Sequence, residues 1–188
     1  MKKGLCIVLL LLSLTLLLAA CAGRSDNGGA YTTNGESGDT QDVRPLPADD
    51  VRLRFGLWDE DLLTAIQPRL DAFTAETGIA VDVNVIPGLE LYGAWLMAAT
   101  GPGDVADVLL MDEQLPLFAE RSVFLPLGSF AEQDGIVWDA VPDCCVYMET
   151  LFALPDPQSA DTPQSFAMYA RTMHIEAAWL LLKSLAGH

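Results

Sequence analysis

The chain has 188 residues, with 26 acidic and 10 basic side chains and a formal net charge of -16 at pH 7. At about 150 residues per domain, this length allows one domain or two small ones. Binding to nucleic acid needs a basic face, so the charge argues against nucleic acid as a partner. Apolar residues make up 51% of the chain, which is too many for a disordered acidic tail.

The first residues have the pattern of an export signal. Lys2 and Lys3 are followed by the apolar run Leu5 to Leu18, which only one serine and one threonine interrupt. This run is shorter than the ~20 residues that a membrane-spanning helix needs. Residues 1–20 are therefore predicted to be a signal peptide and not a permanent membrane anchor.

The end of this segment, Leu18-Ala19-Ala20-Cys21, resembles the lipobox of bacterial lipoproteins. The resemblance implies cleavage before Cys21 and attachment of lipid to that residue, which would hold the protein at the membrane in the cell envelope, outside the cytoplasm. The alternative is an ordinary secretory signal with a chance cysteine. Loss of the signal removes two lysines, so the exported chain would have 8 basic and 26 acidic residues and a charge of -18.

The next segment, residues 21–50, is expected to be the lipidated cysteine and a flexible tether. It is rich in Gly, Ser, Asp, Asn and Thr and has few apolar side chains. Such a stretch buries too little surface to offset the entropy lost on ordering. A globular domain is predicted for residues 51–155, and a linker with a carboxyl-terminal helix for residues 156–188.

The globular part alternates between the apolar periods of strands and helices. The expected elements are a strand at 51–57, a helix between Asp59 and Gly78, a strand at 79–85, a helix at 89–100 and a strand at 105–111. Asp59 is expected to cap the first helix, and Pro68 to kink or restart it. This order of elements predicts an α/β fold with a mainly parallel sheet.

Four motifs in this order resemble the amino-terminal lobe of family 1 extracellular solute-binding proteins, the sugar-binding subunits of bacterial ABC importers. They are Gly56-Leu57-Trp58, the helix end 72–78, the strand 81–85 and the run 103–112. Ala106 stands where the family usually has proline. The resemblance covers about 75 residues and implies a lobe of the periplasmic-binding-protein type II kind.

The family's second lobe is largely missing from this chain. Residues 147–155 resemble the family segment that leads into that lobe, but only a polar stretch, 156–164, follows. Residues 173–179 and 183–185 then resemble a helix that comes late in the family. The chain is interpreted as an internally deleted or truncated member, and a natural one-lobed relative is the alternative.

The candidate ligand-binding residues lie in the loops after the first and third strands, where α/β sheets bind ligands. Sugars need flat aromatic faces for their C–H surfaces and planar polar groups for their hydroxyls. The residues that match are Trp58, Asp59 and Glu60 after the first strand, Asp112, Glu113 and Gln114 after the third, and Tyr92 and Trp95 as further aromatic contacts. The alternatives are helix capping for the acids and core packing for Tyr92 and Trp95.

The resemblance implies a lipid-anchored solute-binding component of an ABC importer, which captures a carbohydrate and delivers it to permease subunits without chemistry. One alternative is a non-transport surface lipoprotein, or a remnant, that docks a protein partner through the surface normally facing the second lobe. Another is a binder of cationic solutes, because residues 51–188 include 20 acidic and 6 basic side chains.

An enzyme is not expected. The sequence has no glycine-rich phosphate loop, no serine-centred elbow and no two-histidine metal motif, and no cofactor or metal is predicted. Cys144 and Cys145 are adjacent, which is not the spacing of a zinc site and would strain a disulfide. Two reduced or separately modified thiols are favoured, and a dyad of Cys145 with His174 lacks a third group to orient it.

Overall fold

The computed structural model describes residues 51–99, 101–138, 141–159 and 163–188, which belong to one compact unit. The predicted signal peptide (1–20), the lipidation site Cys21 and the rest of the predicted tether (to residue 50) lie outside the described residues. Within the described part of the chain, none of the helices combines the length and the apolar character needed to cross a membrane.

A five-stranded sheet organises the domain, in the order β2-β1-β3-β7-β6. β1 pairs in parallel with both β2 and β3, whereas β7 is antiparallel to its two neighbours, β3 and β6. Four strands therefore point the same way and one runs against them, so the predicted mainly parallel α/β sheet is confirmed.

The first half of the domain follows the predicted alternation. Its elements are β1 (Arg52–Leu57), α2 (Glu60–Thr77), β2 (Ala80–Val85), α3 (Leu89–Ala98) and β3 (Val108–Met111). Asp59 caps α2 through its side chain, and Gly78 ends that helix in the left-handed conformation with φ 75°. Pro68 was expected to kink or restart this helix; α2 is continuous through Pro68, so a restart does not occur. β3 is buried along its whole length, as expected for a strand covered on both faces.

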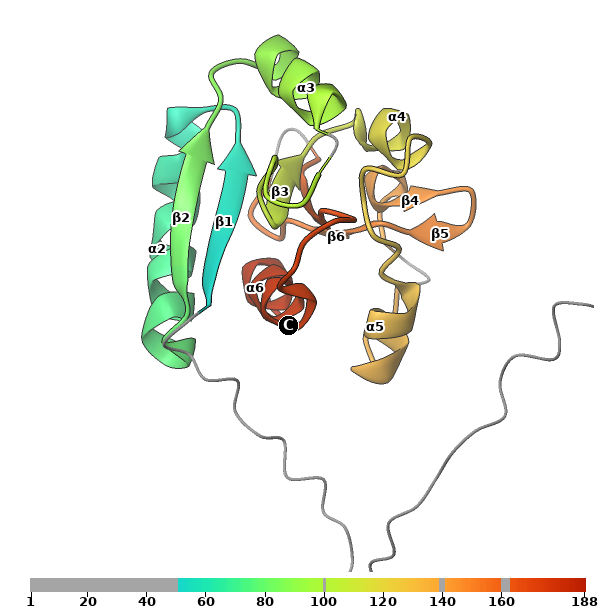
Figure 1. The fold of residues 1–188 in the computed structure, drawn as a ribbon. Coiled ribbons are helices and arrows are strands. Elements are labelled where there is room, and N and C mark those ends of the chain that lie inside the picture. Colours follow the sequence, from blue (N-terminus) through green and yellow to red (C-terminus); the bar gives the residue numbers. More distant parts are fainter. Residues whose placement is uncertain (1–50, 100, 139–140, 160–162) are drawn as a thin grey trace, which may run out of the picture. The chain divides into compact units, whose positions relative to one another are not determined.

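The two faces of the sheet are covered by different helices. Phe55 packs against Phe166 on the face that α2 and α6 (Ile175–Ala186) cover, and α2 and α6 contact each other there. The next residue, Gly56, faces the other way, because a Cβ on it would meet Trp95 of α3. Figure 1 shows α2 beside β2 and β1, and α3 beyond the arrowheads of these two strands.

Short elements follow β3, and the last of them, β6, returns the chain to the five-stranded sheet. They are α4 (Leu115–Ala119), α5 (Gly128–Gln133), the 3-10 turn η2 (Asp143–Cys145), β4 (Val146–Tyr147), β5 (Thr150–Leu151) and β6 (Ala153–Pro155). β4 and β5 form a separate two-stranded hairpin, which contacts α4 through β4 (Figure 1). Met148 and Glu149 make its turn with positive φ angles of 47° and 58°.

The last part of the chain contains more than the predicted linker and helix. Residues 165–168 form β7, which fits between β3 and β6 and is completely buried. Their four apolar or small side chains have no alternating polar pattern to reveal a strand. Only nine residues, 156–164, separate β6 from β7, and the Asp156 N–H donates to the Gln164 carbonyl at 2.8 Å. β6 and β7 are thus a hairpin at the point where the family resemblance places the passage to a second lobe.

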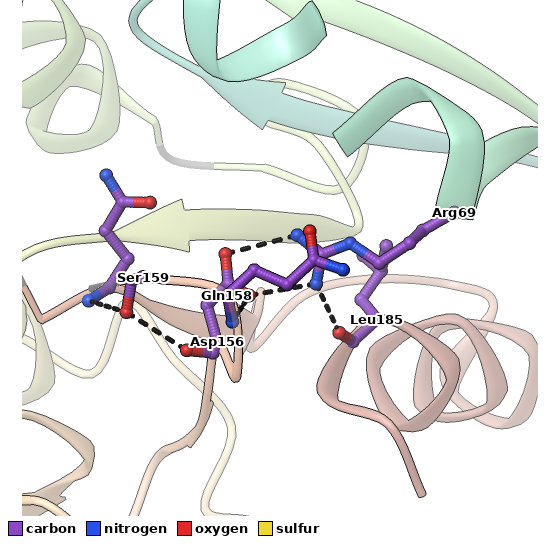
Figure 2. Close-up of polar contacts among 6 residues, drawn as sticks. Arg69, Asp156, Gln158, Ser159 and Leu185 are labelled. Carbon is purple, nitrogen blue, oxygen red and sulfur yellow. Dashed lines mark hydrogen bonds and ion pairs between the residues drawn. The ribbon is translucent and has the colours of Figure 1, made fainter. Parts of the chain in front are cut away.

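A buried ion pair fixes this hairpin to the helices (Figure 2). Arg69 of α2 donates from Nη1 and Nη2 to the two carboxylate oxygens of Asp156, at 2.9 and 3.2 Å. Arg69 Nη1 also donates to the carbonyl of Leu185 near the end of α6, at 2.7 Å, and the guanidinium lies over the ring of Phe166. Asp156 in turn accepts from the Gln158 N–H. One side chain therefore joins α2, α6 and the β6–β7 hairpin.

A second buried carboxylate connects separate segments of the chain at the amino-terminal edge of the parallel strands. Asp107 precedes β3 and is 5% exposed. Its Oδ2 accepts from the backbone N–H of Arg54 at 2.9 Å, and its Oδ1 accepts from the Thr172 hydroxyl at 2.5 Å. Its backbone carbonyl accepts from the N–H of Tyr169. Asp107 thereby links β1, β3 and the segment that leads from β7 into α6.

Candidate functional site

The carboxyl ends of the parallel strands meet at one edge of the sheet, and the predicted site residues follow them. β1 and β3 pair with Phe55 opposite Val108. Asp59 lies four residues beyond Phe55, and Asp112 lies four residues beyond Val108. The two acids therefore follow the ends of neighbouring parallel strands, where α/β sheets place their ligands.

An open hollow of about 540 Å³ lies at this edge. It is lined by Trp58, Asp59, Glu60, Asp61, Val85, Pro87 and Gly88. Three of the predicted residues, Trp58, Asp59 and Glu60, are thus brought together in one concave surface. Trp58 is half-buried, and the side chains of Asp59 and Glu60 are exposed. The arrangement offers one aromatic surface beside several carboxylates.

Asp59 has both a structural role and a free acceptor. Its Oδ1 accepts from the N–H groups of Asp61 and Leu62, at 2.7 and 3.2 Å, and so caps α2. The alternative of helix capping is therefore correct for this oxygen. Its Oδ2 makes no bond within the described residues, and this atom remains available to a ligand in the hollow.

The second predicted loop, 112–114, is organised locally. Asp112 is 7% exposed, and its Oδ1 accepts from the Gln114 N–H at 3.0 Å. Its Oδ2 accepts from the Gln114 amide nitrogen over a long 3.4 Å. Gln114 is half-buried and Glu113 is exposed. These residues follow β3 at the same edge, but they do not line the hollow beside Trp58.

Tyr92 and Trp95 pack behind Trp58. The ring centroids of Trp58 and Tyr92 are 5.4 Å apart, and those of Tyr92 and Trp95 are 5.7 Å apart. Tyr92 is 2% exposed, and its hydroxyl lies 3.1 Å from the Gly56 carbonyl and 2.9 Å from the Leu110 carbonyl. Burial, and secondly the charge of Asp112, raise the pKa of Tyr92 well above its ordinary value, so the hydroxyl remains a donor. Core packing therefore accounts for Tyr92.

Four lining residues were missed by the sequence analysis: Asp61, Val85, Pro87 and Gly88. Three of them follow from the topology, because β2 lies beside β1 in parallel and its carboxyl end reaches the same edge. Pro87 and Gly88 are ordinary turn residues and carry no sign of a ligand. Asp61 lies in the first turn of α2, where an acid is explained by the helix dipole alone.

Cys144 and Cys145 are not joined by a disulfide, and their Sγ atoms are 3.8 Å apart. Cys145 is completely buried, and desolvation is the largest cause that raises the pKa of its thiol. Among the described residues, no group of three or more His, Cys, Asp or Glu side chains could hold a metal ion.

Comparison with known proteins gave matches only among solved structures: no family model matches the chain, and no curated protein matches it. The similar structures include an ABC substrate-binding protein from Listeria monocytogenes in complex with cycloalternan, with 18% identity and a TM-score of 0.48. A solute-binding protein from Thermotoga lettingae bound to α-D-tagatose has 20% identity and a TM-score of 0.45. A family 1 extracellular solute-binding protein from Alicyclobacillus acidocaldarius has 19% identity and a TM-score of 0.46.

These matches concern only part of each molecule. They cover 56 to 57% of this chain, and 28 to 29% of the chains from Listeria, Thermotoga and Alicyclobacillus. The chain thus spans less than a third of the length of the solved proteins to which it is similar.

Proposed function

We propose that this chain is a lipid-anchored, extracytoplasmic solute-binding lobe that captures a carbohydrate and delivers it to the permease of an ABC importer, without catalysis. The observation that supports this proposal is the hollow of about 540 Å³ at the carboxyl edge of β1 and β2, with Trp58 beside three carboxylates. Concave sites with an aromatic wall and a few placed polar groups are typical of small-molecule binding.

The chemistry of the hollow suits a polyhydroxylated ring. The face of Trp58 can cover the C–H surface of a sugar, while carboxylate oxygens accept hydrogen bonds from its hydroxyls. Tyr92 and Trp95 support Trp58 from behind and keep its ring in place. Asp59 is held by its capping bonds to α2, so its second oxygen is presented at little further entropic cost.

The affinity is expected to be low, because one lobe supplies only one side of the site. In two-lobed binding proteins, closure around the ligand completes the contacts. Here only nine residues separate β6 from its antiparallel neighbour β7, too few for an inserted domain. The hollow remains open to solvent, so a ligand keeps much of its hydration.

Titration calorimetry with a panel of mono- and oligosaccharides tests this proposal. We expect binding that Trp58→Ala weakens by roughly tenfold or more, which corresponds to about 1.4 kcal/mol. Trp138→Ala is the matched control, because Trp138 is also half-buried but does not line the hollow. A folded chain that binds none of the sugars, or equal effects of the two tryptophan variants, would contradict the proposal.

A second pair of variants separates the two roles of Asp59. Asp59→Asn keeps an acceptor oxygen for the cap but loses the charge, and asparagine caps helices about as well as aspartate. We therefore expect unchanged stability and weaker binding. Asp59→Ala is expected to lose both the helix cap and the ligand contact, so binding weakens and stability falls by about 1 kcal/mol.

The lipid anchor has its own test. Incorporation of labelled fatty acid into the wild-type chain, and its loss in Cys21→Ser, is expected if the lipobox is processed. Secretion of an unlabelled wild-type protein would leave the ordinary secretory signal as the explanation.

Docking of a protein partner at the same edge is a second candidate function. One observation favours it: Leu89 and Leu91, at the start of α3 next to the hollow, are 40% and 59% exposed. Sedimentation as a function of concentration tests self-association, one form of such docking. Association that Leu91→Ser abolishes would support docking, and a monomer that binds sugar would support capture.

A further inference from the structure

The edge strand β2 has a backbone that can pair with a further strand. β2 lies at one end of the five-stranded sheet, and β1 is its one neighbouring strand among the described residues. β6, at the other end, has three residues and finishes with Pro155, which has no N–H to offer. β2 is twice as long, with six residues and no proline. An open edge of this kind is where another chain can add a strand.

The pairing with β1 determines which backbone groups of β2 point outward. The N–H of Ile86 donates to the carbonyl of Leu57 in β1, at 2.9 Å. The N–H and C=O of one strand residue point to the same side, and successive residues alternate between the two sides. The even-numbered residues of β2 therefore direct their backbone groups to β1, and Val81, Val83 and Val85 direct theirs outward. Within the described part of the chain, these outward groups make no hydrogen bond.

The sequence of β2 complements itself when a second copy runs antiparallel to it. With Val83 opposite Val83 of the second copy, Val81 lies opposite Val85, and Asp82 lies opposite Asn84. Each pair of valines can then exchange both N–H···O bonds, so the pairing uses every outward backbone group of the strand. Asp82 and Asn84 occupy the closer positions between these bonds, with Cα atoms about 4.5 Å apart, where side chains interact directly.

The neighbouring registers are less favourable. A register centred on Asp82 places the Asp82 carboxylates of the two copies opposite each other, and like charges in that position are destabilising. A register centred on Asn84 places Val81 opposite Pro87, which has no N–H to donate. The register centred on Val83 therefore makes the most backbone bonds and has no like charges opposite each other.

We propose that two copies of this chain associate by antiparallel pairing of their β2 strands about Val83, which joins the two sheets into one. The contact is isologous, because the same strand serves both copies across a two-fold axis. The carboxyl ends of the two β2 strands point in opposite directions, so the two hollows lie at opposite ends of the joined sheet.

The polar side chains of β2 fit this contact. A charged residue often protects an edge strand from pairing, but the charge of Asp82 is already compensated by Arg52, whose Nη1 donates to Asp82 Oδ1 at 2.5 Å. Asp82 Oδ2 makes no hydrogen bond within the described residues, and the side chain of Asn84 is exposed. In the dimer, the Asn84 amide of one copy donates to this oxygen of the other.

The overall charge predicts how salt affects the association. Residues 51–188 have 20 acidic and 6 basic side chains, a charge of -14, so two copies repel each other. Salt screens this repulsion, whereas the backbone bonds between the strands are between neutral groups. The association is therefore expected to strengthen as the salt concentration rises.

Sedimentation of the full chain over a range of concentrations, combined with amide hydrogen exchange, tests the proposal. We expect a dimer whose population rises with concentration, and protection of the amides of Val81, Val83 and Val85 that rises in parallel. A chain that stays monomeric at every concentration would overturn the proposal. Protection of these amides in the monomer would mean that another segment of the same chain covers the strand, and would overturn it as well.

An exchange of the two polar residues tests the register. Asn84→Asp places carboxylates opposite each other at two symmetry-related positions, and we expect it to weaken the association roughly tenfold or more. Asp82→Asn combined with Asn84→Asp restores an acid–amide pair at the net charge of the wild type, so the association should recover. Gln133→Glu is the control for the added charge, because Gln133 is exposed in α5, and it should have little effect.

Val83→Pro tests the backbone pairing. It removes the central outward N–H, which β1 does not use, so the edge strand should tolerate proline and the dimer should be lost. Failure of the double variant to recover would overturn the register, because the effect of Asn84→Asp would then not depend on its opposite residue. Association that Leu91→Ser abolishes but Asn84→Asp and Val83→Pro leave unchanged would place the contact at α3 and overturn the proposal.

Discussion

Asp107 and Asp112 stand just before and just after β3, and both are almost completely buried, yet their surroundings differ. Asp107 accepts hydrogen bonds from Arg54 and Thr172, 53 and 65 residues away in the chain. Among the described residues, the carboxylate of Asp112 accepts only from Gln114, two residues away. At one edge of the sheet a carboxylate joins distant segments, and at the other it organises a single turn.

This difference indicates which carboxylate can give up its hydrogen bonds without a large loss of stability. A side chain whose two oxygens hold distant segments cannot turn to a ligand without loss of stability. A side chain with local partners can exchange them at small cost, because the turn is also held by its backbone. We therefore expect substitution of Asp107 to lower the free energy of unfolding strongly, and substitution of Asp112 to lower it little.

Substitution of Asp156 is expected to have the largest effect. It tests whether the contribution of a carboxylate to stability depends on its long-range partners or on the edge of the sheet at which it lies. It lies at the carboxyl edge, beyond β6, but its long-range partner is Arg69. Asp156→Ala leaves the largely buried guanidinium unpaired, and we expect a loss of about 3–5 kcal/mol in urea unfolding followed by tryptophan fluorescence. Arg69→Met combined with Asp156→Asn should recover part of this loss, because no unpaired charge then remains buried.

Glu113→Ala is the control for Asp156→Ala. Glu113 is exposed at the same edge of the sheet, so its loss should change stability by no more than about 0.5 kcal/mol. Similar losses in the two variants would mean that location, and not the ion pair, determines stability.

The alanine variants of Asp107 and Asp112 address the comparison directly. Asp107→Ala leaves the partly buried N–H of Arg54 and the buried hydroxyl of Thr172 without acceptors, and a buried group without an acceptor costs about 1–3 kcal/mol. We expect a loss of about 2–4 kcal/mol for this variant and about 1 kcal/mol or less for Asp112→Ala, measured by chemical denaturation. Equal losses would remove the distinction between the two edges.

The strands of the first half could be predicted because each carries its own signal. Val51, Leu53, Phe55 and Leu57 alternate with polar residues or glycine, and β1 appears at that place. β7 has no such signal: its four residues are all buried, and what makes them a strand is the pairing with β3, more than 50 residues earlier. The resemblance to a late helix of the family did lead to the prediction of α6.

The candidate site could likewise be predicted only where local sequence signals exist. Trp58 and Asp112 could be placed just past strands, because strand ends are visible in the sequence. The role of Tyr92 could not be predicted, since aromatic residues at helical spacing fit a ligand wall and a core equally well. The pairing of Arg69 with Asp156 joins positions 87 residues apart, and no local pattern reports such a contact.

Tyr92→Phe is expected to have a smaller effect on stability. It tests whether Tyr92 only packs behind Trp58 or also contacts the ligand. The variant removes a hydroxyl that bonds to Gly56 and Leu110 but keeps the ring against Trp58. We expect a loss of about 1 kcal/mol in stability and no change in sugar affinity by calorimetry. A large loss of affinity without loss of stability would instead place the Tyr92 hydroxyl on the ligand.

Substitution of Asp134 is expected to have the smallest effect on stability. Asp134 has distant hydrogen-bond partners but is partly exposed, so it tests the contribution of such partners without burial. It follows α5 and accepts from Lys183 Nζ at 2.5 Å and Trp179 Nε1 at 2.7 Å, both in α6, although a third of its side chain is exposed. The hydrogen bond from Lys183, followed by that from Trp179, lowers the pKa of Asp134. The ionised form is thus favoured by folding, and its contribution is present above the unfolded pKa of about 3.9 and is lost as the pH falls through the folded value.

Asp134→Asn should therefore lower stability by about 1 kcal/mol or less at pH 7, because solvent screens a partly exposed pair. The difference from wild type should stay constant down to about pH 5 and shrink below about pH 4, in thermal unfolding measured at a series of pH values. A loss as large as that of Asp107→Ala would mean that distant partners alone make a carboxylate structural. A difference that grows as the pH falls would contradict the lowered pKa. With the small loss expected, burial and distant partners are both required for a carboxylate to contribute strongly to stability, and Asp112, which is buried but bonded locally, has only the first of them.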